Sequence, residues 1–193
     1  MPSGYLSYLQ NSYKEGLAEI VTDQPDIYES LSVYCRKYKD LEEIPLRLYQ
    51  DPMYSLASLY NLNRQIERAL QKTVWLKSGG YLVIEPTEAL TVIDVNTGKS
   101  VLGKNAQRHF MTVNLEASEE IARQIRLRNI SGIIIIDYID LESGKERDRL
   151  LEELKRQVKP DPVPVQVHDI TSLGLVEVTR KKVEKSLAER LKA

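Results

Sequence analysis

The stretch Gly132–Asp140 reads GIIIIDYID and decides the fold class of this chain. Its four consecutive isoleucines are typical of a central strand that is covered on both faces, and an aspartate follows them directly. We expect a helix on each side of this strand, over Leu115–Asn129 and Glu146–Val158. Helices that alternate with strands predict a layered α/β domain. We expect its architecture to be mixed α+β.

Further elements are predicted as one works outward from this stretch. Strand-like runs separated by a Ser-Gly-Gly turn and a Pro-containing turn precede it, at Lys72–Leu76, Tyr81–Ile84 and Leu90–Val95. Two short strands and a final helix are expected after it, at Val165–Val167, Leu175–Val178 and Thr179–Leu191. The tyrosine-rich beginning of the chain predicts mainly helices, over Ile27–Lys37 and Met53–Gln71. The pattern changes near Lys72–Lys77, so we expect one segment over residues 1–73 and an alternating domain over residues 74–193.

Composition limits the class of protein without indicating a function. The chain has 193 residues, of which 42% are hydrophobic and 28% charged, as in ordinary globular proteins that bury a core. Its net charge of −1 argues against a protein held to nucleic acid by bulk electrostatics, although a nuclease needs only local charges. The single cysteine, Cys35, and the lack of a CxxC pair predict no zinc site and fit a reducing, cytoplasmic setting. No apolar run is long enough to predict a membrane span.

Two acidic strand ends are the strongest candidates for chemistry. Asp94 and Asn96 alternate with Ile93 and Val95, so both polar side chains should project from one face of their strand. Asp137 leaves the isoleucine strand at its carboxyl end, where open α/β sheets place their ligands. Two such carboxylates could hold Mg²⁺, which takes oxygen ligands, polarises a phosphoryl oxygen and helps to generate hydroxide from water. For either aspartate alone, a turn or helix cap is the alternative reading.

A set of basic residues lies near these strand ends in the sequence. Lys99 and Lys104 follow the first strand end, and Arg123 and Arg126 share a face of the Leu115–Asn129 helix, so all four could contact phosphate. The alternative is a solvated helix face on which Glu119 and Arg123 form an ordinary i,i+4 pair.

Other singular residues favour structural roles. The two histidines, His109 and His168, are expected in loops as surface or packing residues, and Trp75 in the core, with stacking on an RNA base as the alternative. The run beginning at Arg180 is expected at the solvated start of the last helix.

The residues also resemble a known family. The stretch Trp75–Asn96, WLKSGGYLVIEPTEALTVIDVN, is similar to the nuclease core of the ribonuclease E/G family. The likeness continues in further blocks with the family's order and spacing, at Asn114–Ala117, Glu120–Asn129, Gly132–Asp140 and Gly174–Arg180.

The resemblance implies a specific enzyme. It implies a DNase I-like catalytic domain preceded by a partial ribonuclease H-like segment, with Asp94 and Asp137 as Mg²⁺ ligands and Asn96 orienting the scissile phosphate or the water. Mn²⁺ would be a substitute metal. The implied reaction is hydrolysis of single-stranded RNA to a 5′-phosphate and a 3′-hydroxyl, during processing and decay of ribosomal, transfer and messenger RNA.

Departures from the family pattern narrow this expectation. No S1-type RNA-binding domain, 5′-monophosphate sensor or CPxC zinc link is recognised in the sequence. We therefore expect this chain to be a fragment or a truncated protein. A homodimer or homotetramer is expected only for the full-length protein. A non-catalytic RNA-binding or assembly module of the same fold remains the alternative. A nucleotide-binding α/β domain is disfavoured because GxxxxGK[ST] and GxGxxG are absent.

Overall fold

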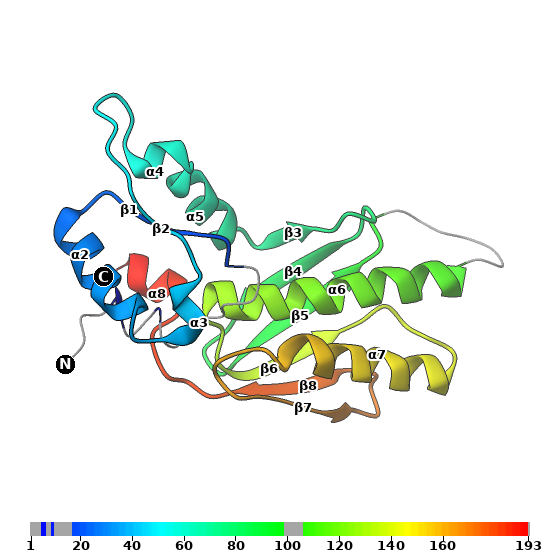
Figure 1. Ribbon diagram of the computed structural model, residues 1–193. Helices are drawn as coiled ribbons and strands as arrows, with labels where there is room; N and C mark the ends of the chain where they lie inside the picture. The colour runs from blue at the N-terminus through cyan, green and yellow to red at the C-terminus, as the bar shows by residue number, and fades with distance from the viewer. Residues whose placement is uncertain (1–4, 7–8, 10–16, 99–105, 193) are drawn as a thin grey trace. The chain divides into compact units, whose positions relative to one another are not determined.

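The chain folds into two compact units, Met1–Glu67 and Arg68–Ala193, and each is described here by itself (Figure 1). The computed structural model describes residues 5–6, 9, 17–98 and 106–192. The predicted mixture of helices and strands is confirmed.

The first unit has a small parallel sheet with helices against it. Strand β1 (Ile20–Thr22) pairs with β2 (Leu46–Leu48), and the connection between them contains α2 (Pro25–Cys35) and α3 (Lys39–Glu42). Pro25 stands at the start of α2, where its missing N–H would have had no helical partner. The described apolar side chains that this unit buries are few, namely Leu31, Cys35 and Leu41.

The single helix expected over Met53–Gln71 is broken in two. Ser55 caps α4 (Leu56–Leu59) by accepting a hydrogen bond from the Ser58 N–H, and α5 (Leu62–Leu70) begins three residues after α4 ends. Asn61 between them has a φ of 50°, in the left-handed region. Asparagine adopts this conformation more readily than most residues, so an apolar periodicity that runs through the break does not reveal it.

The second unit is built on a six-stranded mixed sheet. Its strand order is β3-β4-β5-β6-β8-β7, with the bounds β3 (Thr73–Trp75), β4 (Tyr81–Pro86), β5 (Leu90–Asn96), β6 (Gly132–Asp137), β7 (Val165–Ile170) and β8 (Val176–Arg180). Only the central β5–β6 pair is parallel among these neighbours. The two edge strands differ: β3 has three residues, whereas β7 is longer and shifts register against β8 between Val167 and Ile170.

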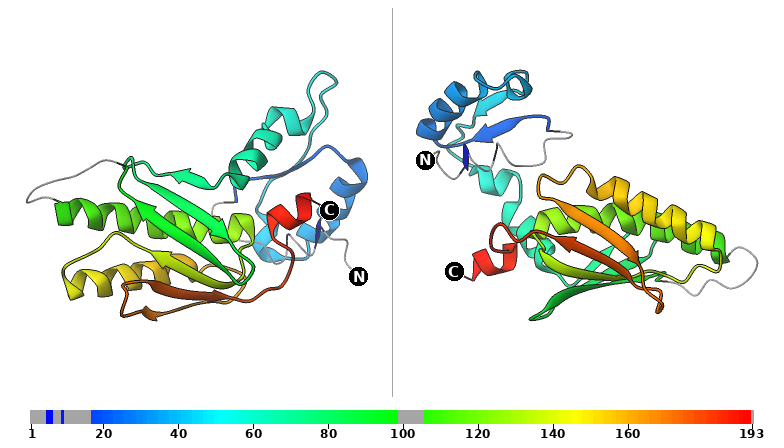
Figure 2. Two further views of the ribbon diagram at one scale, coloured as in Figure 1. Left: turned by 180° about the vertical axis from the view of Figure 1, so that it is seen from behind. Right: turned by 90° about the horizontal axis from the view of Figure 1, so that it is seen from below.

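Both long helices cover the same face of this sheet (Figure 2). Helices α6 (Ala106–Arg128) and α7 (Gly144–Val158) pack on alternate strand residues that are fully buried, among them Leu82, Ile93, Ile134, Ile136 and Val178. Each such side chain contributes roughly 1.5–3 kcal/mol of burial free energy. The intervening residues form the other face, and there Ile133 is 49% exposed. The expectation of a strand covered on both faces was therefore wrong: among the described residues of the second unit, helices cover β6 on one face.

Helix α6 is also longer than expected and brings His109 into a helix rather than a loop. It has 23 residues but carries charged side chains along its length. Within residues 17–98 and 106–192, and at the few described positions before them, no helix combines the length and apolar character that crossing a membrane requires.

The end of the chain corrects a second expectation, that residues from Thr179 start a solvated helix. Strand β8 instead continues to Arg180, and the last helix, α8, covers only Leu187–Leu191. The Arg180 guanidinium is buried and donates to both carboxylate oxygens of Asp161, at 3.0 and 3.1 Å, and to Asn129 Oδ1 at 2.7 Å. Loss of one partner from such a buried pair costs about 3–5 kcal/mol, so Arg180 fixes the end of β8 within the fold.

Candidate functional site

The three predicted polar residues lie together on the uncovered face of the sheet. Asp94 on β5 stands opposite Asp137 on the parallel strand β6. The side chains of Ile93, Val95 and Ile136 next to them are buried under the helices, so the two aspartates point to the other face. Asp94 and Asp137, which each follow the apolar run of their strand, thus lie side by side, as expected for two strand ends at one edge of the sheet.

Asn96 joins this pair through a direct hydrogen bond. Its Nδ2 donates to Asp94 Oδ2 at 2.8 Å, as the two-residue spacing along β5 allows. The bond fixes the orientation of the Asp94 carboxylate. The arrangement therefore presents two carboxylates and one amide on adjacent strands.

The charge of Asp137 is unfavourable in this setting. Although the Asp137 side chain is exposed, its partial desolvation at the sheet raises its pKa above the ordinary value, and the negative charges of Asp94 and Asp140 raise this pKa further. Asp140, in the segment after β6, thus acts on the centre electrostatically. A bound cation would relieve this repulsion, because it interacts favourably with all three carboxylates.

The oxygen set fits a magnesium ion that keeps several waters. Magnesium is typically held by one or two carboxylates together with substrate phosphate. The described part of the chain holds no group of three or more histidine, cysteine, aspartate or glutamate side chains arranged as metal ligands. Asp94, Asp137 and the Asn96 amide would therefore leave most coordination positions to water and phosphate.

Two buried polar residues of α6 hold the segment that follows Asp137. Asn114 Nδ2 donates to the Ile139 carbonyl at 2.7 Å, and Asn114 Oδ1 accepts from the Ile139 N–H at 3.1 Å. Ser118 Oγ lies 2.8 Å from the Tyr138 hydroxyl. Burial raises the pKa of Tyr138, which stays a neutral phenol. These roles were not among the sequence-based expectations, although an asparagine on the apolar face of a predicted helix is itself a signal of a buried hydrogen-bonding role.

A second contact from α6 supports the strand end at Asn96. The Glu116 carboxylate accepts from the backbone N–H groups of Lys77 and Ser78, the latter at 3.0 Å, in the turn between β3 and β4. That turn packs against the end of β5: a Cβ on Gly80 would lie 2.7 Å from the Asn96 carbonyl oxygen, and one on Gly98 would overlap the Gly79 carbonyl. Gly98 also has a φ of 70°. Glycines are therefore needed for the close approach.

The four predicted phosphate contacts have different outcomes. Lys99 and Lys104 lie outside the described residues. Arg123 donates to both carboxylate oxygens of Glu120, at 2.9 and 2.7 Å, so its ion pair is with Glu120 rather than with the Glu119 that the spacing suggested. Arg126 donates to the Gln157 carbonyl on α7 at 3.3 Å. Both described arginines therefore have structural contacts, and their phosphate contacts stay predictions.

Trp75 is not in the core, where it was expected. Its side chain is 70% exposed, and its ring centroid lies 5.1 Å from that of Tyr81 with a tilt of 53°. The next residue, Leu76, is buried instead. A strand of three residues at the sheet edge carries too little periodicity to reveal which of its side chains points inward.

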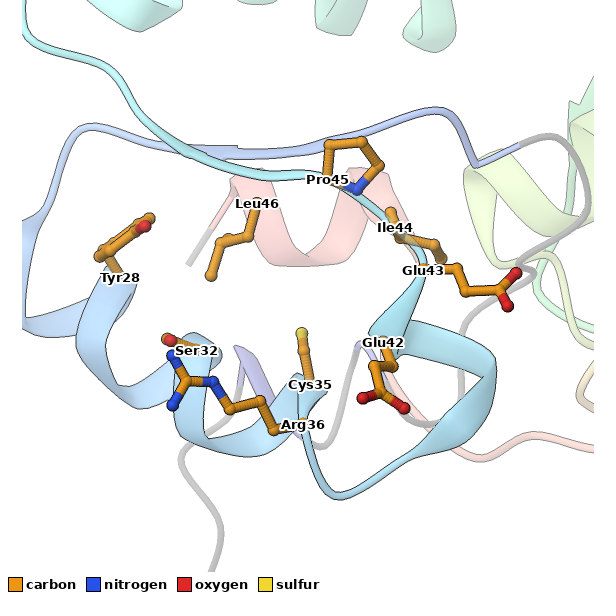
Figure 3. A pocket seen from close by; sticks show the side chains of 9 residues that line it. All are labelled: Tyr28, Ser32, Cys35, Arg36, Glu42, Glu43, Ile44, Pro45 and Leu46. Carbon is orange, nitrogen blue, oxygen red and sulfur yellow. The ribbon is translucent and has the colours of Figure 1, made fainter.

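Two further side chains, those of His168 and Cys35, are ligands or nucleophiles by residue type and have other contacts. His168, on β7 rather than in a loop, has Nε2 2.9 Å from the Thr179 hydroxyl. Cys35 faces Leu46 in a pocket of the first unit that Arg36 and Glu42 flank (Figure 3). Burial raises the pKa of the Cys35 thiol, so it packs as a neutral group rather than serving as a nucleophile.

The chain is similar to known sequences over most of its length. The sequence profile of the Ribonuclease E/G family matches residues 2–183. The chain is 40% identical over 172 residues to Ribonuclease G of Salmonella typhimurium strain SL1344. These aligned residues make up 89% of this chain and 35% of that protein.

Two cyanobacterial proteins are similar as well. Ribonuclease E of Synechocystis is 40% identical over 184 residues, which cover 94% of this chain and 27% of that protein. Ribonuclease E of Nostoc is 45% identical over 130 residues, which cover 67% and 19%. The chain thus spans about a third or less of the length of these curated relatives.

Proposed function

The chain belongs to the Ribonuclease E/G family, and from this premise we propose that it carries the catalytic centre of a Mg²⁺-dependent RNA endonuclease. The observation that supports this most directly is the pairing of Asp94 with Asp137 across parallel strands, with Asn96 bonded to Asp94. The substrate in this proposal is single-stranded RNA.

Each of the three residues has a distinct role in this proposal. Asp94 and Asp137 hold the cation, and the repulsion that raises the pKa of Asp137 favours cation binding. Asn96 holds the Asp94 carboxylate in one orientation and offers an amide beside the phosphate. When bound, Mg²⁺ supplies a Lewis acid for the phosphoryl oxygen and a source of acidic water.

The products follow from which bond is broken. The oxygen of water forms a bond to phosphorus while the bond from phosphorus to O3′ breaks. The attacking water gives up one proton, and the leaving O3′ atom takes one up, which gives a 3′-hydroxyl, while the other fragment keeps a 5′-phosphate.

The family supports further proposals about the wider protein. The second unit represents a DNase I-like core, and the first unit is part of a ribonuclease H-like segment. Substrates are precursors of ribosomal and transfer RNA together with messenger RNA, which the enzyme meets in the cytoplasm. A longer form of the protein would assemble as a homodimer or homotetramer.

The experiment compares the parent chain with Asp94→Asn and Asp137→Asn on a 5′-phosphorylated single-stranded RNA. We expect Mg²⁺-dependent cleavage by the parent and none by either variant, because each change removes a ligand charge. Asp148→Asn is the matched control, since Asp148 is exposed on α7 and the chemical change is the same. Binding of Mn²⁺, followed by electron paramagnetic resonance, should weaken in the two site variants alone.

Two results would contradict the proposal. If both site variants cleave as fast as the parent, the metal assignment is wrong. If the parent binds RNA but does not cut it in millimolar Mg²⁺, the chain is the non-catalytic RNA-binding module.

A further inference from the structure

An exposed aromatic pair lies on the same sheet face as the candidate centre. Trp75 on β3 stands opposite Tyr81 on β4, and Tyr81 stands opposite Asn96 on β5. Residues directly opposite each other in antiparallel strands share a face. The buried neighbours Leu76, Leu82 and Val95 point to the helical side, which confirms the assignment of the face.

The row therefore runs from the aromatic pair directly into the polar centre. Tyr81 is the cross-strand neighbour of Asn96, and Trp75 lies two strand spacings away, about 10 Å. An exposed tryptophan is unusual, because this side chain is normally buried over most of its area. Here 70% of it is open, and only Tyr81 contacts its ring among the aromatic pairs that the structure describes.

We infer that Trp75 and Tyr81 form a stacking subsite for a base of the RNA next to the scissile phosphate. This inference rests on the proposed function. The row combines flat apolar rings with an amide and two carboxylates, which matches a nucleotide, with its planar base and charged backbone, better than an apolar protein segment. Exposed Lys77 in the same hairpin supplies a positive charge for the backbone. Stacking on aromatic rings tolerates all four bases, so the subsite would contribute affinity with little sequence preference.

The intrinsic fluorescence of Trp75 is a direct probe of this subsite. Trp75 is the only tryptophan in the chain, so its fluorescence reports on one position. We would titrate the Asp137→Asn chain, which does not cut, with a short single-stranded RNA. The expected result is saturable quenching of the fluorescence. A series of RNAs with one abasic nucleotide each should lose the quenching at one position of the strand.

Variants then test the contribution to affinity, with anisotropy of fluorescein-labelled RNA as the readout. Trp75→Ala in the same background should raise the Kd roughly 5- to 150-fold, as expected for the loss of one stacked base. Trp75→Phe keeps an aromatic ring and should restore most of the affinity. Ile133→Ala is the matched control, since Ile133 is exposed on the same sheet face at the other end of β6 and should leave the Kd unchanged.

The outcomes separate this inference from the proposed function. Cleavage by the parent with an unchanged Kd for Trp75→Ala overturns the subsite alone. Position-specific quenching without any cleavage by the parent supports the subsite and overturns the proposed catalysis. Equal quenching by every abasic RNA in the series means that the backbone rather than a base contacts Trp75, and this also overturns the subsite.

Discussion

At the scale of single residues, Asp137 combines a functional position with an unfavourable charge. Partial desolvation and the carboxylates of Asp94 and Asp140 raise its pKa, so the folded state binds a proton at Asp137 more tightly than the unfolded state does. The free energy of unfolding therefore falls as pH rises from the unfolded pKa through the raised folded pKa. The ionised form of Asp137 therefore destabilises the fold relative to the protonated form.

This sign gives a prediction that does not depend on catalysis. In EDTA at pH 7, Asp137→Asn should unfold at a higher temperature than the parent, because it removes the repulsion. Solvent screens the exposed carboxylate, so the gain should be below about 1 kcal/mol, or up to about 4 °C. Mg²⁺ should raise the midpoint of the parent and leave that of the variant nearly unchanged. Trp75 fluorescence, which reports on the same unit, measures the transition.

The opposite order of midpoints in EDTA would show that Asp137 is held by favourable contacts instead of by repulsion. Asp148→Asn again serves as the control, and its midpoint should not respond to Mg²⁺ differently from that of the parent.

At the scale of elements, α6 is the support on which the candidate centre is built. Its apolar residues pack on the sheet, while Asn114 and Ser118 hold the segment after β6 and Glu116 holds the turn beside β5. One helix thus fixes the surroundings of both strand ends, Asp94–Asn96 and Asp137.

Asn114→Ala tests this support. The change leaves the Ile139 N–H and carbonyl without their partner, which should cost about 2–4 kcal/mol of stability. It should also raise the Mg²⁺ concentration for half-maximal cleavage about 10- to 100-fold, as for residues that orient metal ligands. Thr112→Ala on the same helix is the control, because the Thr112 hydroxyl donates only to the Arg108 carbonyl of its own turn. Lower stability with an unchanged Mg²⁺ requirement would reduce Asn114 to a packing role.

The elements also show how far sequence reasoning reaches. Alternation along β5 correctly placed Asp94 and Asn96 on one face, because period 2 is a local property of any strand. The expectation that β6 is covered on both faces was wrong because cover depends on where α6 and α7 pack. Four consecutive isoleucines are compatible with one covered face or with two. The roles of Asn114 and Arg180 were missed because each depends on a partner 19 or more residues away in the sequence. The exposure of Trp75 was missed because a strand of three residues carries too little periodicity to show which side chain points inward.

At the scale of the whole chain, the two units differ in how much apolar surface they bury. The second unit contains a continuous cluster that joins the sheet to α6 and α7. Among the residues described in the first unit, buried apolar side chains are limited to Leu31, Cys35 and Leu41. Local stability follows buried apolar contact, so the first unit should open more often.

Hydrogen exchange measures this difference. We expect amides of β5, β6 and α6 to exchange at least about 100-fold more slowly than those of β1 and β2. Leu41→Ala should accelerate exchange in the first unit and leave the second unchanged, because Leu41 belongs to the small core. If both units instead accelerate together, they unfold as one cooperative body.

The register shift in β7 has a consequence for the behaviour of the protein in concentrated solution. An open sheet ends in strands whose free N–H and carbonyl groups can recruit a strand from another molecule and so start a fibre. The extra residue near Asp169 breaks the regular spacing of those groups, and the Asp169 carboxylate accepts the Ile170 N–H at 2.8 Å. At the opposite edge β3 offers only three residues. The sheet can thus expose one face to a ligand while neither edge offers a long, regular template for aggregation.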